Sequence, residues 1–282
     1  MGISPSSSAQ QARQRIAQRL REIRLDAGLS ARAIAKEAGW HESKSSRIEH
    51  ARMVPSAGDI RAWCRACGVE DQAADLIAAS RTADSMYVEW ERLQKSGLRR
   101  LQESKVPLYE GTRHFRVYCS NVIPGLFQTR DYAGALLSSI STFRGVPNDV
   151  EDAVAARVAR SRVLHQGDHR FAVLMEEWVL RCRVGDAEVM AGQLRHLLTV
   201  MSLPSVSLGV IPFTAPRRMW PVEAYNIFDE TLVQVELLSA AVNVTQPDEV
   251  SQYVRGFAEL AGIAVYGAGA RSLIAAAIKE LD

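Results

Sequence analysis

The sequence has 282 residues, 47% of them hydrophobic and 23% charged, with a formal net charge of +2. This composition is typical of a globular protein and excludes a disordered chain, because it holds ample apolar material for a core. The four cysteines exclude a disulfide-rich secreted scaffold, and no uncharged apolar run reaches the ~20 residues of a membrane span, so we expect a cytoplasmic protein without signal peptide or membrane contact.

Charge is distributed unevenly along the chain. Residues 1–69 hold 12 Lys and Arg against 6 Asp and Glu, a balance of +6, whereas the remainder holds 22 against 26, a balance of −4. A basic front part on an acidic body indicates a polyanionic partner for the front part alone.

The first part of the chain has a helical pattern. Residues 1–10 are rich in Ser and Gln, which predicts a flexible tail. Apolar residues at helical spacing then predict a helix over residues 12–27, ended by Gly28, and Ser30 is expected to cap the next helix. Residues 11–80 are therefore predicted to form one helical domain, with further helices at 31–38, 41–50, 59–67 and 71–79.

The second part of the chain has a different pattern. Residues 81–107 predict a helical connector, with Trp90, Leu93 and Leu101 on one side and a break at Gly97. Residues 108–282 mix helical segments with short strands, which predicts an α+β domain and a fold that is mainly α with a smaller β part. The expected helices are 130–139, 150–164, 186–201, 247–265 and 270–281, and the expected strands are 170–175, 206–211, 224–228 and 232–237.

The segment at residues 29–49 has the layout of a helix-turn-helix. Ala35 lets the two helices approach closely, Gly39 makes the tight turn, and Ile48 faces the core. The outer face of the second helix carries polar side chains, so this helix fits the major groove of DNA with its N-terminal half against base edges. These side chains are Glu42, Ser43, Lys44, Ser46 and Arg47.

This segment resembles the XRE (Cro/repressor-type) helix-turn-helix family, down to the Ser-x-Arg-Ile-Glu run at residues 45–49. The resemblance covers residues 12–79. It implies that the helix starting near His41 is the recognition helix and that Glu42, Ser43 and Arg47 read bases. The full set of residues expected to bind DNA is Ser30, Arg32, His41, Glu42, Ser43, Lys44, Ser46, Arg47 and Arg52.

The resemblance also assigns the remaining positions of the motif. Lys44 and Ser46 would face bases or phosphates, and Ser30 would donate to a phosphate at a helix N-terminus. His41 stands where the family often has a hydroxyl cap, which predicts a weaker cap. Ser45 stands where an apolar residue is frequent, which places a hydroxyl near the core.

The rest of the chain resembles the second domain of WhiJ-type, antitoxin-like regulators of actinobacteria. Residues 122–133 (VIPGLFQTRDYA) resemble a signature block of that domain, and residues 184–198 and 204–213 resemble later blocks. The resemblance, over residues 108–277, implies a cytoplasmic regulator whose second domain serves dimerisation, binding of a small acidic partner protein, or binding of an unidentified small-molecule effector.

From the residues alone, the signature block predicts local structure. Pro124 begins a turn, Thr129 caps a helix, and Tyr132, Leu136 and Leu137 face inward. Maintenance of the fold is the favoured interpretation of this block.

Other reactive side chains do not form a recognisable site. Cys64 and Cys67 lie in one predicted helix with no second pair, which favours core packing over zinc binding. His165 and His169 fit a solvated loop. No nucleotide-binding or catalytic signature occurs, so no metal, no cofactor and no catalytic residue is predicted.

Two further groups of side chains allow alternatives. Glu176 and Glu177 are adjacent and are expected to point in different directions, which disfavours shared acid–base chemistry. Five aromatic residues either line a ligand pocket or, as is more common, fill the core. They are Tyr109, Phe115, Tyr118, Trp178 and Trp220.

Together these features favour a sequence-specific transcriptional regulator that is not an enzyme. We expect it to bind double-stranded DNA as a homodimer. Two alternatives stay open: a module that mainly sequesters a small acidic protein, and an enzyme with a DNA-targeting domain.

Overall fold

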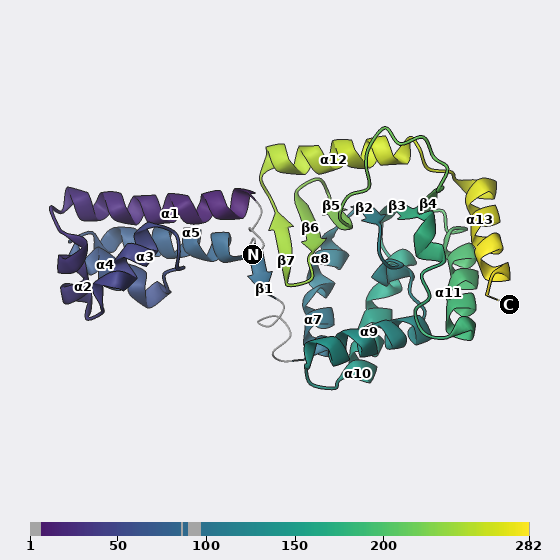
Figure 1. The fold of residues 1–282 in the computed structure, drawn as a ribbon, viewed down its shortest axis with the longest axis horizontal. Helices are drawn as coiled ribbons and strands as arrows, with labels where there is room; N and C mark the ends of the chain where they lie inside the picture. Colours follow the sequence, from purple (N-terminus) through teal and green to yellow (C-terminus); the bar gives the residue numbers. More distant parts are fainter. Residues whose placement is uncertain (1–6, 86, 90–96, 282) are drawn as a thin grey trace. The chain divides into compact units, whose positions relative to one another are not determined.

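The structure is a computed structural model that describes residues 7–85, 87–89 and 97–281. The chain divides into two compact units, residues 1–88 with 242–244 (unit 1) and residues 89–241 with 245–282 (unit 2). Unit 1 is helical apart from its contribution to the strands, whereas unit 2 combines a sheet with helices (Figure 1). The predicted fold class, mainly α with a smaller β part, is confirmed.

The helices of unit 1 follow the order that the sequence pattern predicts. They are α1 (Ser7–Asp26), α2 (Ala31–Ala38), α3 (Glu42–Glu49), α4 (Ala57–Ala66) and α5 (Ala73–Ser85), with the short turn η1 (Glu70–Gln72) before α5. Helix α1 begins at Ser7, so the expected flexible tail is wrong for residues 7–10. No Gly or Pro occurs between residues 6 and 27, so nothing in the sequence stops the helix from extending to Ser7.

A single apolar cluster holds the helices of unit 1 together. Leu20, Ile34 and Trp63 are fully buried in it, and the Trp63 Nε1–H donates to the Leu20 carbonyl at 3.0 Å. Cys64 is also fully buried and Cys67 packs against the same cluster, both as free thiols. Burial raises the pKa of Cys67 to about 11. The core-packing interpretation of the two cysteines is therefore confirmed.

The sheet is mixed, and its centre lies in unit 2. Its strand order is β1-β7-β6-β5-β2-β3-β4. Strand β3 is parallel to both β2 and β4, whereas β5 is antiparallel to β2 and β6. The strands are β1 (Tyr87–Glu89), β2 (His114–Cys119), β3 (Arg170–Glu176), β4 (Val206–Ile211), β5 (Tyr225–Phe228), β6 (Leu232–Glu236) and β7 (Ala240–Val244). The sequence pattern predicts β3, β4, β5 and β6 but misses the other three.

The predicted connector at residues 81–107 is only partly helical. Strand β1 replaces a helix there, and the expected helical positions Trp90 and Leu93 lie outside the described residues. Leu101 is buried in α7 (Leu98–Ser104), which follows Gly97. A short helix α8 (Val106–Gly111) comes next.

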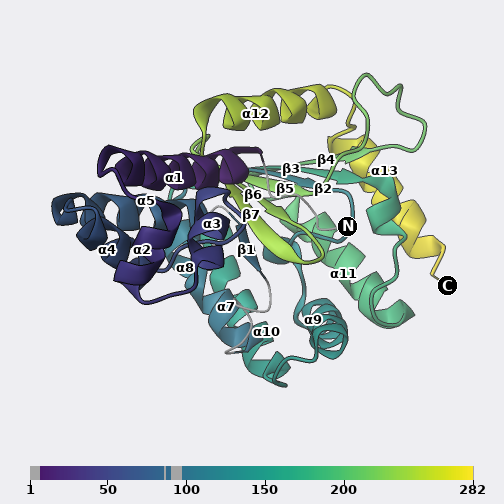
Figure 2. The same ribbon diagram turned by 60° about the vertical axis from the view of Figure 1, so that its left-hand side comes forward.

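Helices cover both faces of the sheet in unit 2. Helix α12 (Pro247–Ala261) packs on β5 and β6, and α9 (Arg130–Arg144) and α11 (Ala187–Val200) lie on the opposite side (Figure 2). Helix α13 (Gly267–Lys279) packs against β4 and α11. The remaining elements are α10 (Val150–Arg160), η2 (Gly125–Phe127), η3 (Ser161–Leu164) and η4 (Glu177–Leu180).

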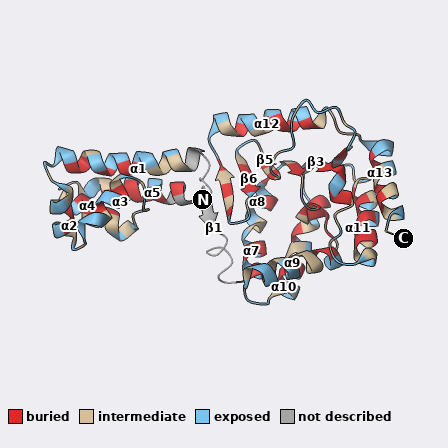
Figure 3. Cartoon of the chain, in the orientation of Figure 1, coloured by how far each residue is buried: buried red, intermediate tan, exposed pale blue. Residues whose placement is uncertain are grey.

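Aromatic side chains fill the core of unit 2, where Figure 3 shows the buried residues between the layers. Phe115 of β2 stacks on Phe171 of β3, with ring centres 4.7 Å apart, and Tyr109 and Tyr118 are also buried. The core interpretation is wrong for Trp178 and Trp220, which are 43% and 71% exposed.

Both acidic residues at the end of β3 are buried, and each has its own partners. Glu176 accepts a hydrogen bond from the Tyr118 hydroxyl at 2.8 Å and two from the Arg217 guanidinium. Glu177 accepts one from Arg181 at 2.8 Å and one from the Phe213 backbone N–H at 2.8 Å. The expectation that the two carboxylates point in different directions is confirmed.

Gln193 of α11 joins two of the signature blocks. Its side chain is fully buried, donates from Nε2 to the Phe127 carbonyl at 2.7 Å and accepts from the Thr129 N–H at 2.7 Å. Thr129 in turn caps α9, as predicted, by accepting from the Tyr132 N–H at 3.3 Å. Tyr132 and Leu137 are buried, so the fold-maintenance interpretation of this block is confirmed for these residues.

Candidate nucleic-acid interface

Helices α2 and α3 form the predicted helix-turn-helix. Ser30 caps α2, because its hydroxyl accepts a hydrogen bond from the Ala33 N–H at 3.1 Å. Gly39 ends α2 in the left-handed conformation, with φ of 72°, which a residue with a side chain adopts only with strain. Both local predictions are confirmed.

His41 caps α3, the helix predicted to read DNA. Its Nδ1 accepts a hydrogen bond from the Ser43 N–H at 3.2 Å, so a side-chain cap is present, and its being weaker than a hydroxyl cap stays a prediction. An imidazole nitrogen with a free lone pair takes the place of the hydroxyl oxygen that usually accepts this bond. In the neutral ring the proton then lies on Nε2, which leaves a donor on an exposed side chain.

The outer face of α3 consists of exposed polar side chains. Glu42, Ser43, Ser46 and Arg47 are all exposed. Arg47 donates from Nε to the Ser43 carbonyl at 3.3 Å, which holds the side chain along the helix and leaves its two terminal nitrogens for a ligand. A guanidinium held in this way can reach the paired acceptors on the major-groove edge of guanine.

The inner face of α3 is buried. Ile48 is 1% exposed, and Ser45 is fully buried, as the motif predicts. The Ser45 hydroxyl accepts a hydrogen bond from Trp40 Nε1–H at 2.9 Å, so the polar atom near the core has a partner.

Lys44 does not lie on the outer face. Its Nζ forms an ion pair with Asp59 of α4 at 2.6 Å and stands 4.7 Å from the centre of the Trp40 ring. The Lys44 ammonium group therefore already has a partner within the domain, and its contact with bases or phosphates stays a prediction. Asp59 also completes a capping box with Ser56, a Ser-x-x-Asp signal that the sequence contains and that the helix prediction missed.

The Lys44–Asp59 pair predicts acid sensitivity of α3 and α4. Burial acts to raise the pKa of Asp59, but hydrogen bonds from Lys44 and Ser56 outweigh it, so this pKa lies below its usual value. Because the folded pKa is lower than the unfolded one, the stabilisation is present above about pH 4 and is lost as the pH falls through the folded value. Hydrogen exchange of α3 and α4, corrected for intrinsic rates, should show less protection at about pH 3 than at pH 6.

The matched variant is Asp59→Asn, which removes the titrating group. Its protection should be lower than that of the wild type at pH 6 and should change less with pH. Parallel pH profiles for the two proteins would contradict this role of Asp59.

A buried ion pair fixes α3 against α1. Arg24 donates from Nε and Nη2 to the Glu49 carboxylate, the second bond at 3.0 Å, and from Nη1 to the Leu29 carbonyl at 2.7 Å. The hydrogen bond with Glu49 raises the pKa of Arg24. Both side chains are largely buried, at 11% and 6% exposure. Glu49 belongs to the predicted motif, but its pairing with Arg24 is not among the sequence predictions. The signal was a charged residue, Arg24, next to the apolar stripe of α1.

The remaining predicted DNA-binding residues, Ser30, Arg32 and Arg52, are exposed. The Ser30 oxygen already serves as a cap, but its hydroxyl proton remains available as a donor to phosphate. Within the part of the chain that the structure describes, no group of three His, Cys, Asp or Glu side chains is arranged to hold a metal ion. Across the same residues, no helix has both the length and the apolar character that crossing a membrane requires.

Comparison with protein families identifies both parts of the chain. A family model described as a helix-turn-helix domain matches residues 15–77, and one described as a domain of unknown function (DUF5753) matches residues 108–276. The second match covers more than half of the chain, so the protein belongs to the DUF5753 family. The helix-turn-helix domain points to a DNA-binding regulator rather than an enzyme. No curated protein and no solved structure matches the chain.

Proposed function

We propose that this DUF5753 protein is a sequence-specific transcriptional regulator of the XRE (Cro/repressor) type, in which α3 reads the major groove. The observation that carries the proposal is the division of α3 into two faces. Its inner face is fixed by Ile48 and by the Arg24–Glu49 pair, while its outer face exposes polar side chains to solvent. A rigid helix with a free polar face is what base readout requires.

The proposed DNA contacts follow from which polar side chains of the helix-turn-helix are exposed. Glu42, Ser43 and Arg47 read bases, and Lys44 is a positioning residue that orients α3 through Asp59. Glu42 can only accept hydrogen bonds, for example from a cytosine amino group. The residues proposed to contact bases or phosphates are Ser30, Arg32, His41, Glu42, Ser43, Ser46, Arg47 and Arg52.

The proposal extends to the organisation of the protein. Residues 11–80 form the DNA-binding domain, 81–107 the connector, and 108–282 the regulatory domain. The protein would act in the cytoplasm as a homodimer. The dimer would place two copies of α3 about 34–36 Å apart on a pseudo-palindromic DNA site. The resemblance to WhiJ-type, antitoxin-like regulators supports a second domain for dimerisation or for binding a small acidic protein. Sequestration of that protein as the main role is the alternative.

Replacing Arg47 by Ala tests the assignment of α3. If Arg47 reads a guanine, the variant should bind its target about 5- to 150-fold more weakly, equivalent to about 1–3 kcal/mol. The measurement is fluorescence anisotropy with DNA from upstream of the protein's own gene and with random duplex, at two salt concentrations. Binding to random duplex should change much less, because it depends mainly on phosphate contacts.

The control is Arg195→Ala, which removes the same charge from the exposed surface of α11 in unit 2. It should leave the affinity for the target unchanged. Equal affinities of wild type and Arg47→Ala for the selected DNA would show that Arg47 does not read it.

A further inference from the structure

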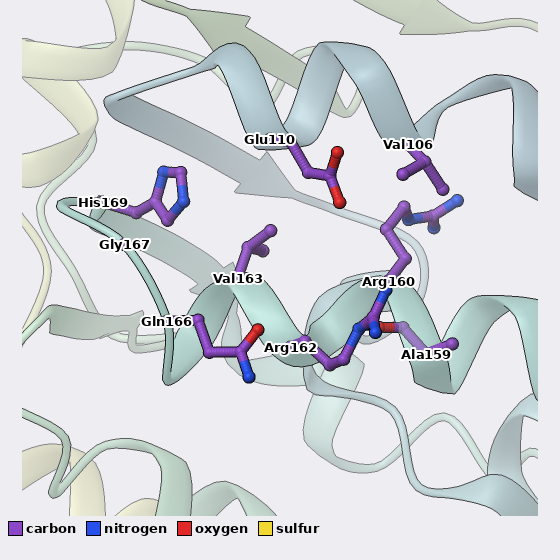
Figure 4. Close-up of a pocket in the computed structure, with 9 residues that line it drawn as sticks. All are labelled: Val106, Glu110, Ala159, Arg160, Arg162, Val163, Gln166, Gly167 and His169. Atoms are coloured by element: carbon purple, nitrogen blue, oxygen red, sulfur yellow. The ribbon is translucent and has the colours of Figure 1, made fainter.

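A pocket of about 210 Å³ lies in unit 2 between α8, the end of α10 with η3, and the loop that leads to β3 (Figure 4). Val106 and Val163 contribute apolar surface, whereas Glu110, Arg160 and His169 contribute polar groups. The volume is below the ~300–1,000 Å³ of pockets for drug-sized ligands, so it fits only a smaller molecule. Several lining residues, including Glu110, are exposed, so a ligand can enter from solvent.

Arg160 is a buried cation without a carboxylate partner. Its residue is 6% exposed, and its Nη1 donates to the backbone and side-chain oxygens of Gln102, both at 3.2 Å. The guanidinium lies 4.6 Å from the centre of the Tyr109 ring. Among the described residues, no carboxylate lies within 4 Å of Arg160 and its Nε has no hydrogen-bond partner. Burial of an uncompensated charge is unfavourable, which makes it a candidate for binding an anion.

The surroundings of Arg160 reinforce this positive charge. Arg157, one turn earlier on α10, also donates to neutral groups, to Gln102 Oε1 at 3.1 Å and to Gln128 Oε1 at 2.6 Å. Burial, and then the charge of Arg160, lower the pKa of Arg157 to about 10. Arg162 adds a third guanidinium at the exposed rim of the pocket.

The opposite wall carries a carboxylate. Figure 4 shows the Glu110 side chain pointing from α8 into the pocket, while the Arg160 side chain rises from the end of α10. Both residues line the pocket, and within the part of the chain that the structure describes they form no ion pair with each other. His169 is fixed beside them by a hydrogen bond between its Nδ1 and the Thr112 carbonyl at 2.6 Å.

We propose that this pocket binds a small zwitterion, whose carboxylate or phosphate group is held by Arg160 and Arg162 and whose ammonium group is held by Glu110. A ligand of this kind would pair with the charge of Arg160 and the charge of Glu110 at the same time, whereas a simple anion or cation would pair with only one of them. The binding site concerns unit 2 alone, so it does not depend on whether α3 reads DNA.

Isothermal titration calorimetry of the full chain tests the proposal with three probes: phosphoethanolamine, γ-aminobutyrate and inorganic phosphate. At least one of the two zwitterions should bind in the millimolar range or tighter and should bind more tightly than inorganic phosphate. The phosphate and carboxylate probes show which acid group the site prefers. Absence of binding by both zwitterions at millimolar concentration would overturn the proposal.

Variants separate this site from general charge effects. Arg160→Gln should weaken binding of the zwitterion at least tenfold, and Arg162→Gln, at an exposed position that does not endanger folding, should weaken it less. Glu110→Gln should weaken binding of the zwitterion. It should strengthen binding of inorganic phosphate, because it removes the repulsion between the Glu110 carboxylate and the phosphate anion. Arg195→Gln on α11 is the control and should have no effect. Equal affinities for the wild type, Arg162→Gln and Glu110→Gln would also overturn the proposal.

Discussion

Replacing Glu49 by Ala is expected to destabilise the helix-turn-helix by about 3–5 kcal/mol, the range seen when one partner of a buried ion pair is removed. The reason is the position of Arg24, which would remain buried between α1 and the end of α3 without its carboxylate. The loss would also release the end of α3 from Arg24 of α1. The free energy of opening, measured by native-state hydrogen exchange of α1 and α3 in the full chain, gives this value directly.

Two comparisons make the result specific. Glu22→Ala breaks the exposed Arg19–Glu22 pair of α1, at 47% and 45% exposure, and should change the same free energy by less than about 1 kcal/mol. The double variant Arg24→Met, Glu49→Leu should recover much of the lost stability, because it removes both buried charges together. Similar effects of Glu49→Ala and Glu22→Ala would contradict the role of the buried pair.

Replacing Gln193 by Leu is expected to destabilise unit 2 by about 2–6 kcal/mol. The substitution nearly preserves volume but leaves the buried Phe127 carbonyl and the partly buried Thr129 N–H without their Gln193 partner, at up to about 1–3 kcal/mol for each group. It should also loosen the start of α9, because Thr129 is the residue that caps this helix. Urea unfolding of the full chain, combined with hydrogen exchange of α9, measures both effects.

The control is Gln252→Leu on the exposed surface of α12, where the same change removes no interior hydrogen bond. It should alter stability by no more than about 0.5 kcal/mol. If α9 kept its full protection in Gln193→Leu, the buried amide would have no structural role beyond filling space.

Local signals explain why the helix-turn-helix was predictable. Ser30 and Gly39 act through hydrogen bonds to residues no more than four positions away, so sequence spacing is sufficient to place them. The ion pair of Lys44 is not predictable in the same way, because its partner Asp59 lies 15 residues away in another helix. Contacts between distant residues determine whether a polar side chain already has a partner inside the protein, and the sequence spacing does not show these contacts.

The same distinction applies to the sheet. Strand β2 was missed although its residues alternate, because its identity depends on pairing between Phe115 and Phe171, far apart in the sequence. The pocket was equally hidden. Arg160 ends a helix in a position that usually faces solvent, and His169 lies in a loop as predicted, but the fold places both in the lining of one pocket with Glu110 of α8.

The strand order also affects how the chain folds as it leaves the ribosome. The contacts of unit 1 that hold α3 are made by residues up to 85, so this part can form early in synthesis. Strand β2, near the middle of the sheet, pairs on one side with β3 and on the other with β5, which begins at Tyr225. Synthesis proceeds at about 5–20 residues per second, so one edge of β2 stays open for several seconds after Cys119 is made. An open strand edge is a template for wrong pairing, so the nascent second domain is exposed to aggregation while the first is already folded.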